Sequence, residues 1–215
     1  VGSSHAVVYS GTVMETARNL TNGESWHVRL QGAPGCLFVD PGNTGNACAD
    51  LWTIADRYIR EQKPDAVVVV ATQGQQEAPD RLHNKPGEDM VSWVKSVTAQ
   101  GTQVIAMRDV PRFNDDMLEC GAQKGWNNPE CIRLGSQELP ELTKYQHDIE
   151  AAGGSWVDLT EVVCPEDMCR PAQGGLVTYF DHSHLTDAYA RSLAQKTADQ
   201  LAPLIGWWPP KVWSA

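Results

Sequence analysis

A run of valines in the first half of the chain constrains the fold more than any other feature. Residues 66–71 read AVVVVA, an unbroken series of apolar and mostly β-branched side chains. A strand with one solvent-exposed face alternates apolar and polar residues, whereas a strand buried on both faces does not. Such strands occur in parallel sheets that helices cover from both sides. The run therefore predicts the α/β class.

Three further segments have the composition of strands, and amphipathic helical patterns alternate with them. The candidate strands are Trp26–Leu30, Thr102–Met107 and Gly154–Leu159, and the candidate helices span residues 51–59, 88–101, 142–153 and 186–201. This alternation predicts a three-layer α/β/α sandwich with a flavodoxin-like parallel sheet of about five strands. The first strand ends at Val1. We expect it to be truncated at the N-terminus, because a strand of ordinary length needs about four more residues.

The bulk composition indicates a single domain over residues 1–215 and narrows the choice of partners. The chain is 41% hydrophobic and 20% charged, as ordinary globular domains are. Its formal net charge of −10 repels phosphate backbones, so nucleic acid is not an expected partner. No apolar run approaches the roughly 20 residues that span a bilayer.

The six cysteines fall into three pairs that are close in the sequence. These pairs are Cys36 with Cys48, Cys120 with Cys131, and Cys164 with Cys169. An even number of locally paired cysteines in turn-rich connections predicts three disulfides and an oxidising compartment. A zinc site or free thiols are the alternative, although zinc sites usually take closer, CxxC-like pairs. The spacing alone leaves the connectivity open.

The first chemical motif is the tetrapeptide Gly-Ser-Ser-His at residues 2–5, directly before a helical pattern. A serine at a strand-to-helix turn presents its hydroxyl beside the unpaired N–H groups of the helix N-terminus, which can stabilise a developing oxyanion. Gly2 allows the chain to turn sharply. Ser4 is therefore a candidate nucleophile. The alternative is that Ser3 or Ser4 only caps the helix.

The second motif places Asp181 and His184 three residues apart, just before the last helical pattern. A hydroxyl nucleophile needs a general base, and that base needs a carboxylate to fix its tautomer. Asp181 can orient His184, and His184 can face Ser4 at the C-terminal edge of the sheet, where open α/β sheets bind their ligands. The alternatives are a surface turn, or a metal site made of Asp181, His182 and His184 that lacks further ligands.

In these two segments the chain resembles the SGNH hydrolase family, and in particular the extracytoplasmic SGNH domains attached to acyltransferase-3 membrane proteins of bacteria. The family motifs are GDSH and DxxH followed by Leu and Ser or Thr. This chain reads GSSH at residues 2–5 and DHSHLT at residues 181–186. The resemblance implies the SGNH fold, no cofactor and no metal. It also implies a catalytic triad of Ser4, His184 and Asp181.

The chain departs from the family pattern near the expected oxyanion hole. Ser3 replaces the Asp of GDSH. After the strand at residues 66–71, Gln73 stands where the family has an Asn. Gln73 can offer an amide N–H one methylene further out. Gly35 can correspond to a glycine of the family's second motif, or it can be a turn glycine beside a disulfide. The expected oxyanion hole therefore uses Ser4, Gly35 and Gln73.

By resemblance, the expected function is that of a serine-dependent O-acyltransferase domain. It would move a short acyl group, such as acetyl, to an extracytoplasmic glycan or glycolipid through an acyl-serine intermediate. A membrane-embedded acyltransferase-3 domain in the same polypeptide would supply the acyl group at the outer face of a bacterial membrane, in the cell envelope. A carbohydrate O-acyl esterase is an alternative that uses the same residues. Ser3 and Gln73 also leave open a catalytically degenerate domain that binds a glycan or docks its partner.

Overall fold

The computed structural model describes residues 1–20, 27–41, 47–74, 84–86, 89–138, 142–201 and 203–204. At its centre lies a parallel sheet with the strand order β1-β4-β6. These strands are β1 (Ala66–Val70), β4 (Gln103–Met107) and β6 (Ser155–Val157). Each of them falls inside a segment that the sequence predicts to be a strand, and the predicted α/β class is confirmed.

Residues 1–2 extend this sheet beyond β1. The nitrogen of Val1 donates to Val68 O (2.6 Å), and Val70 N donates to Val1 O (3.3 Å). On its other side, Gly2 exchanges two backbone hydrogen bonds with residues 31–33, at 3.2 and 3.1 Å. The chain therefore runs between β1 and residues 31–33 immediately before it reaches Ser4.

The resulting spatial order is residues 31–33, residues 1–2, β1, β4 and β6, which is the order of a flavodoxin-like sheet. The expected strand at Trp26–Leu30 differs in detail. Residues 27–30 carry no strand pairing, and Trp26 lies outside the described residues. The pairing is instead a single parallel bridge between Gly2 and Gly32.

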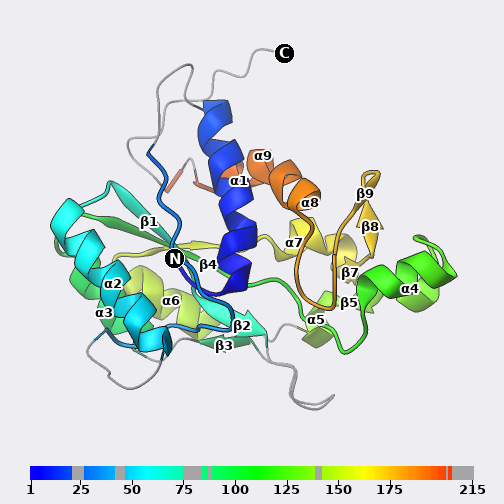
Figure 1. Ribbon diagram of the computed structural model, residues 1–215, viewed down its shortest axis with the longest axis horizontal. Helices are drawn as coiled ribbons and strands as arrows, with labels where there is room; N and C mark the ends of the chain where they lie inside the picture. Colours follow the sequence, from blue (N-terminus) through cyan, green and yellow to red (C-terminus); the bar gives the residue numbers. More distant parts are fainter. Residues whose placement is uncertain are drawn as a thin grey trace.

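Helices cover both faces of the sheet (Figure 1). One face carries α1 (Ser4–Leu20), α8 (Asp187–Ser192) and α9 (Ala194–Leu201), and the other carries α2 (Ala47–Gln62), α3 (Met90–Thr98) and α6 (Thr143–Ala151). The predicted three-layer arrangement is confirmed.

Alternate side chains of β1 build the two cores, because successive residues of a strand point to opposite faces. Val70 belongs to the core beneath α1, α8 and α9, whereas Val67 and Val69 belong to the core on the opposite face. Trp52 of α2 and Trp93 of α3 fill that second core with their rings 5.7 Å apart. The valine run is therefore buried on both sides, as its composition predicts.

Short elements occupy the connections between the layers. They are β2 (Thr72–Gly74), β3 (Asn84–Pro86), α4 (Met117–Lys124), η1 (Pro129–Cys131), β5 (Arg133–Leu134), α5 (Gly135–Glu138), α7 (Thr160–Val163), η2 (Pro165–Asp167), β7 (Met168–Cys169), β8 (Ala172–Gln173) and β9 (Leu176–Val177). Three antiparallel pairs form among the short strands, namely β2 with β3, β5 with β7, and β8 with β9.

The last predicted helix is divided in the structure. The sequence predicts one helix over residues 186–201, whereas α8 ends at Ser192 and α9 begins at Ala194. Leu193 lies between them with αR dihedral angles, and its carbonyl still accepts from Thr197 N (2.9 Å). The break is therefore slight. Thr186 caps α8 as expected, because its hydroxyl accepts from Tyr189 N (3.2 Å).

Disulfides fix three of the connections in the structure. They join Cys36 to Cys48, Cys120 to Cys131, and Cys164 to Cys169, the pairs that are close in the sequence. Three disulfides fit an oxidising, extracytoplasmic location. Within the described ranges, no helix combines the length and the apolar character needed to cross a bilayer.

Candidate active site

Ser4 and His184 meet at the C-terminal edge of the sheet although they are 180 residues apart in sequence. Ser4 is the first residue of α1, so its hydroxyl lies at a helix N-terminus. The distance between Ser4 Oγ and His184 Nε2 is 2.8 Å, which is within hydrogen-bond reach. This edge of the sheet is where the sequence predicts a site.

Asp181 holds the other side of the His184 ring. Its Oδ2 lies 2.7 Å from His184 Nδ1. Because an ionised carboxylate has no proton to donate, Nδ1 carries the hydrogen of this bond. Nε2 is then free to accept from the Ser4 hydroxyl. The three side chains thus form one hydrogen-bonded chain with the polarity that proton removal from a serine requires.

Backbone hydrogen bonds fix the Asp181 carboxylate. Its Oδ1 accepts from the backbone N–H groups of Ser183 and His184, both at 2.7 Å. Burial raises the pKa of Asp181, but these two hydrogen bonds and the one from the His184 ring outweigh it, so that the pKa lies below its usual value. The carboxylate therefore remains ionised at neutral pH and can stabilise a protonated His184.

The segment that carries His184 is attached to the hydrophobic core at both of its ends. Tyr179 forms an antiparallel bridge with Leu185, and Phe113 N donates to His182 O (2.8 Å). The rings of Phe113 and Tyr179 also pack edge to face, 5.0 Å apart, and both side chains are fully buried. His184 therefore extends from a short loop whose two ends are anchored in the core.

The two residues predicted to complete the oxyanion hole lie in different settings. Gly35 occupies an exposed turn with a φ of +71°, in which Cys36 N donates to Ala33 O (3.2 Å). Gln73 lies in β2, where it pairs with Lys85 and is half-buried. Their part in an oxyanion hole stays a prediction.

Gly32 lies next to the nucleophile segment and was missed by the sequence reasoning. A Cβ added there would lie 3.2 Å from Gly2 O and 3.5 Å from Ser3 O, a tight contact that glycine avoids. By contrast, a Cβ on Gly35 would meet no described atom within 4 Å. Gly32 and Gly35 stand in the same tetrapeptide, GAPG, and nothing in the sequence indicates which of the two lies beside the nucleophile.

A second histidine–carboxylate pair adjoins the first, and it too was not anticipated. His5 Nδ1 donates to Asp109 Oδ1 in a buried hydrogen bond. The His5 and His184 rings lie 4.5 Å apart with an interplanar angle of 67°. Asp109 follows the end of β4 by two residues, so its position at the carboxyl end of a central strand was the available signal.

Phe180 is the exposed neighbour of His184. Its side chain is 55% exposed, and its ring centroid lies 5.9 Å from that of His184. Single exposed apolar side chains are common, but a ring in this position, beside a candidate active site, is an available contact surface for a ligand.

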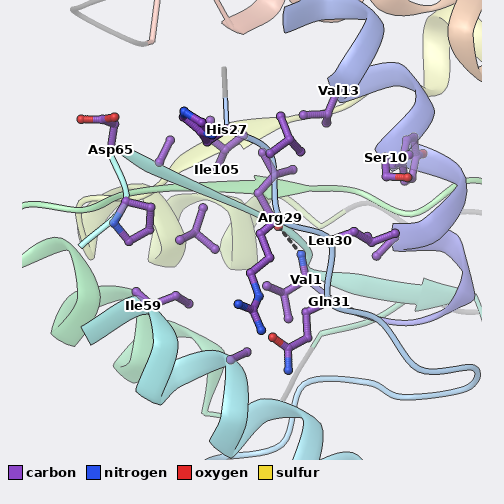
Figure 2. A pocket seen from close by; sticks show the side chains of 18 of the residues that line it. Val1, Ser10, Val13, His27, Arg29, Leu30, Gln31, Ile59, Asp65 and Ile105 are labelled. Atoms are coloured by element: carbon purple, nitrogen blue, oxygen red, sulfur yellow. Dashed lines mark hydrogen bonds between the residues drawn. The ribbon is translucent and has the colours of Figure 1, made fainter. Parts of the chain in front are cut away.

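A separate cavity of about 580 Å³ lies beside β1 and residues 27–31 (Figure 2). Its lining includes Asp65 and Ala66, at the amino end of β1, and Arg29, which covers the ring of Tyr58 at 4.1 Å. None of Ser4, Asp181 and His184 lines it. The cavity follows β1 from Ala66 to Val70, whereas open parallel sheets bind their ligands at the carboxyl ends of the strands, the edge at which Ser4 and His184 meet.

The family follows from comparison with known proteins. The chain belongs to the family described as the SGNH domain (fused to AT3 domains), whose model matches residues 1–199. Its fold is similar to that of the lipopolysaccharide acetyltransferase periplasmic domain of Salmonella ser. Paratyphi A, with a TM-score of 0.63 and 14% sequence identity. That match covers 94% of this chain and 81% of the other. A search among curated protein sequences gives no match.

Family membership confirms the resemblance seen in the two motifs. It also supports a role as an enzyme of acyl transfer in general. In this family the SGNH domain is fused to AT3 domains, which agrees with the expected membrane-embedded partner domain. The structural similarity, at 14% identity, adds the SGNH-like α/β fold.

Proposed function

We propose that this domain transfers a short acyl group to an extracytoplasmic glycan or glycolipid through an acyl intermediate on Ser4. The observation that carries the proposal is the hydrogen-bonded chain from Ser4 through His184 to Asp181, with links of 2.8 and 2.7 Å. Membership of a family whose SGNH domains are fused to AT3 domains supports acyl transfer as the reaction class.

In the first half-reaction, His184 acts as the general base. Its Nε2 removes the proton of the Ser4 hydroxyl while Oγ attacks the carbonyl carbon of an acyl ester or thioester. A bond from Oγ to the carbonyl carbon forms, and the bond to the leaving group breaks. The imidazolium returns its proton to that leaving group. The Asp181 carboxylate stabilises the imidazolium during this exchange.

Charge on the carbonyl oxygen requires donors close to Ser4. The start of α1 supplies N–H groups without partners in the helix, including that of Ser4 itself. We expect Gly35 and Gln73 to add donors once an acyl group is bound. Losing one donor of an oxyanion hole costs about 2.7–4 kcal/mol of barrier, so we expect the reaction to slow if either position fails to donate.

In the second half-reaction, a sugar hydroxyl takes the place of the leaving group. His184 removes its proton, the oxygen attacks the acyl-serine, and Ser4 is released with its proton restored. The acyl group would come from an AT3 domain of the same polypeptide, at the outer face of a bacterial membrane. If water resolves the intermediate instead, the same residues make a carbohydrate esterase.

Replacing Ser4 tests the proposal, with Ser3 as a matched control. Ser3 is the neighbouring serine, is 5% exposed, and accepts from His5 N through its hydroxyl (3.3 Å). We expect Ser4→Ala to lower aryl-acetate hydrolysis by roughly a thousandfold or more and to abolish labelling by a serine-reactive phosphonate. Ser3→Ala should remain labelled and retain most activity.

Two outcomes would count against the proposal. Unchanged hydrolysis and labelling in Ser4→Ala would remove Ser4 as the nucleophile. Glycan binding without turnover, unaffected by His184→Ala, would instead favour a degenerate binding domain. Product analysis with and without a glycan acceptor separates the remaining two functions, because a transferase yields acylated glycan and an esterase yields only free acid.

A further inference from the structure

The buried pair of His5 and Asp109 is the strongest chemical feature that the proposed reaction does not use. His5 follows Ser4 on the first turn of α1 and is 2% exposed, and Asp109 follows β4 and is 1% exposed. A direct hydrogen bond joins His5 Nδ1 to Asp109 Oδ1. Residues that are 104 positions apart thus meet immediately behind the nucleophile.

Asp109 is rigidly placed by its own contacts. Its Oδ1 also accepts from Val110 N (2.9 Å), and its backbone N–H donates to the buried hydroxyl of Thr72 (2.9 Å). These bonds tie it to the carboxyl ends of both β4 and β1. The orientation of the His5 ring is therefore set by the sheet, as well as by α1.

The His5 ring in turn contacts the candidate general base. Its centroid lies 4.5 Å from that of His184, and the rings meet edge to face at 67°. His184 also has Phe180 as a ring neighbour, but at 5.9 Å and with a side chain that is 55% exposed. His5 is thus the closer and the buried support of the His184 imidazole.

One ring nitrogen of His5 makes no hydrogen bond to the described residues. This suggests that the ring contributes by its packing, and not by its hydrogen bonds alone. His5 Nε2 is buried and has no hydrogen-bond partner among the described residues. The His5 side chain also lines a very small pocket together with His184, Val8, Tyr9, Val110 and Leu185. Leaving a buried nitrogen without a partner is unfavourable, so hydrogen bonding by itself does not account for a histidine at this position.

We infer that the His5–Asp109 pair is a positioning device for the His184 ring. Asp109 fixes His5, and His5 packs against His184 so that Nε2 stays directed at Ser4 Oγ. The inference rests on the proposed function, because it assigns a role to His5 only if His184 activates Ser4. A misplacement of about 1 Å in such a site can lower the rate by about a hundredfold.

The decisive variant is His5→Asn. The side-chain amide of asparagine can donate to Asp109 from about the place of Nδ1, but it has no ring to contact His184. We expect a roughly 10- to 100-fold lower kcat for aryl-acetate hydrolysis, calculated per site titrated with the phosphonate, and an unchanged KM. His147→Asn, on the exposed face of α6, is the matched control and should keep wild-type kcat.

A second variant, His5→Phe, keeps a ring beside His184 but removes the donor to Asp109. We expect it to lower Tm more than His5→Asn and kcat less. If kcat of His5→Asn equals that of the wild type, or if kcat in both variants only follows Tm, His5 is a structural residue and the inference is wrong. If the wild-type protein itself is not labelled at Ser4, the proposed function fails, which is a different result.

Discussion

At the scale of single residues, the Asp181 carboxylate concentrates the most hydrogen bonds in the candidate site. Two backbone N–H groups and the His184 ring donate to it, and together they lower its pKa against the opposite effect of burial. A lowered pKa in the folded state means that the ionised form stabilises the fold. That contribution is present above the unfolded pKa of about 4 and is lost as the pH falls through the lower folded value.

Asp181→Asn tests both the chemistry and this pH dependence. An amide cannot fix the Nδ1–H tautomer as a carboxylate does, so we expect kcat to fall by about 10³- to 10⁴-fold. The variant should also be less stable than the wild type at pH 7, with a difference that shrinks as the pH falls below about 4. Urea denaturation at pH 7 and pH 3 measures it. A difference that grows toward acid would contradict the assigned direction of the pKa shift.

Phe180 gives a prediction about the acceptor. Its exposed ring beside His184 offers a flat apolar face to a pyranose. We expect Phe180→Ala to raise KM for a glycan acceptor roughly two- to twelvefold, the equivalent of about 0.5–1.5 kcal/mol, and to leave aryl-acetate hydrolysis unchanged. Phe180→Trp should keep the native KM. Leu118→Ala, at an exposed position on α4, is the control, and an equal effect there would exclude stacking at Phe180.

At the scale of elements, the loop that carries His184 is fastened at its end by the cap of α8. The Thr186 hydroxyl accepts from Tyr189 N (3.2 Å) and donates to Val177 O (2.5 Å), and Thr186 N donates to Thr178 O (2.9 Å). Thr186 thus caps the N-terminus of α8 and also holds the loop against the end of β9.

Removing this cap should affect stability and activity together. Thr186→Ala loses both side-chain hydrogen bonds, and we expect it to lower the free energy of unfolding by about 0.5–2 kcal/mol. Because His184 lies two residues earlier, kcat should fall severalfold as well. Thr186→Ser keeps the hydroxyl and should behave as the wild type. Chemical denaturation and aryl-acetate assays on the same samples measure both, and a stability loss without any change in kcat would show that the cap does not hold the loop.

Some of these elements can be predicted from the local sequence, and others cannot. The buried strand at residues 66–71 and the Thr186 cap are local properties, visible in composition and in a helix-start pattern. The interruption at Leu193 and the short helices between residues 117 and 138 depend on caps and tertiary packing, which a periodic pattern does not encode. The position of Asp109 at the carboxyl end of a predicted strand marks it as a candidate site residue, but nothing in the sequence pairs it with His5, which lies 104 residues away.

At the scale of the whole molecule, the site depends on the two ends of the described chain lying together. The hydroxyl of Thr12 in α1 donates to Ala190 O in α8 (2.7 Å), and that of Thr16 donates to Ala194 O in α9 (3.0 Å). Both threonines are almost fully buried. These bonds join the helix that begins with Ser4 to the helices that follow His184.

Thr12→Val combined with Thr16→Val should weaken the contact of α1 with α8 and α9, because valine keeps the shape of threonine but cannot donate a hydrogen bond. We expect each lost hydrogen bond to cost about 0.5–1.5 kcal/mol, so that the double variant unfolds at lower urea and has lower kcat at 37 °C. Thr53→Val is the matched control, because Thr53 of α2 is exposed and its hydroxyl donates to Pro41 O (2.7 Å) away from this contact. Native stability in the double variant would mean that apolar packing alone joins the two ends.

The central claim is that an imidazole from one end of the chain activates a hydroxyl from the other, so that Ser4 becomes acylated. Incubation with an aryl acetate, rapid acid quench and peptide mapping by mass spectrometry measure this directly. The account predicts one acetyl group on the peptide that contains Ser4, retained in Ser3→Ala and absent in Ser4→Ala and His184→Ala. An acetylated Ser3, or turnover without any acetyl-serine, would contradict it.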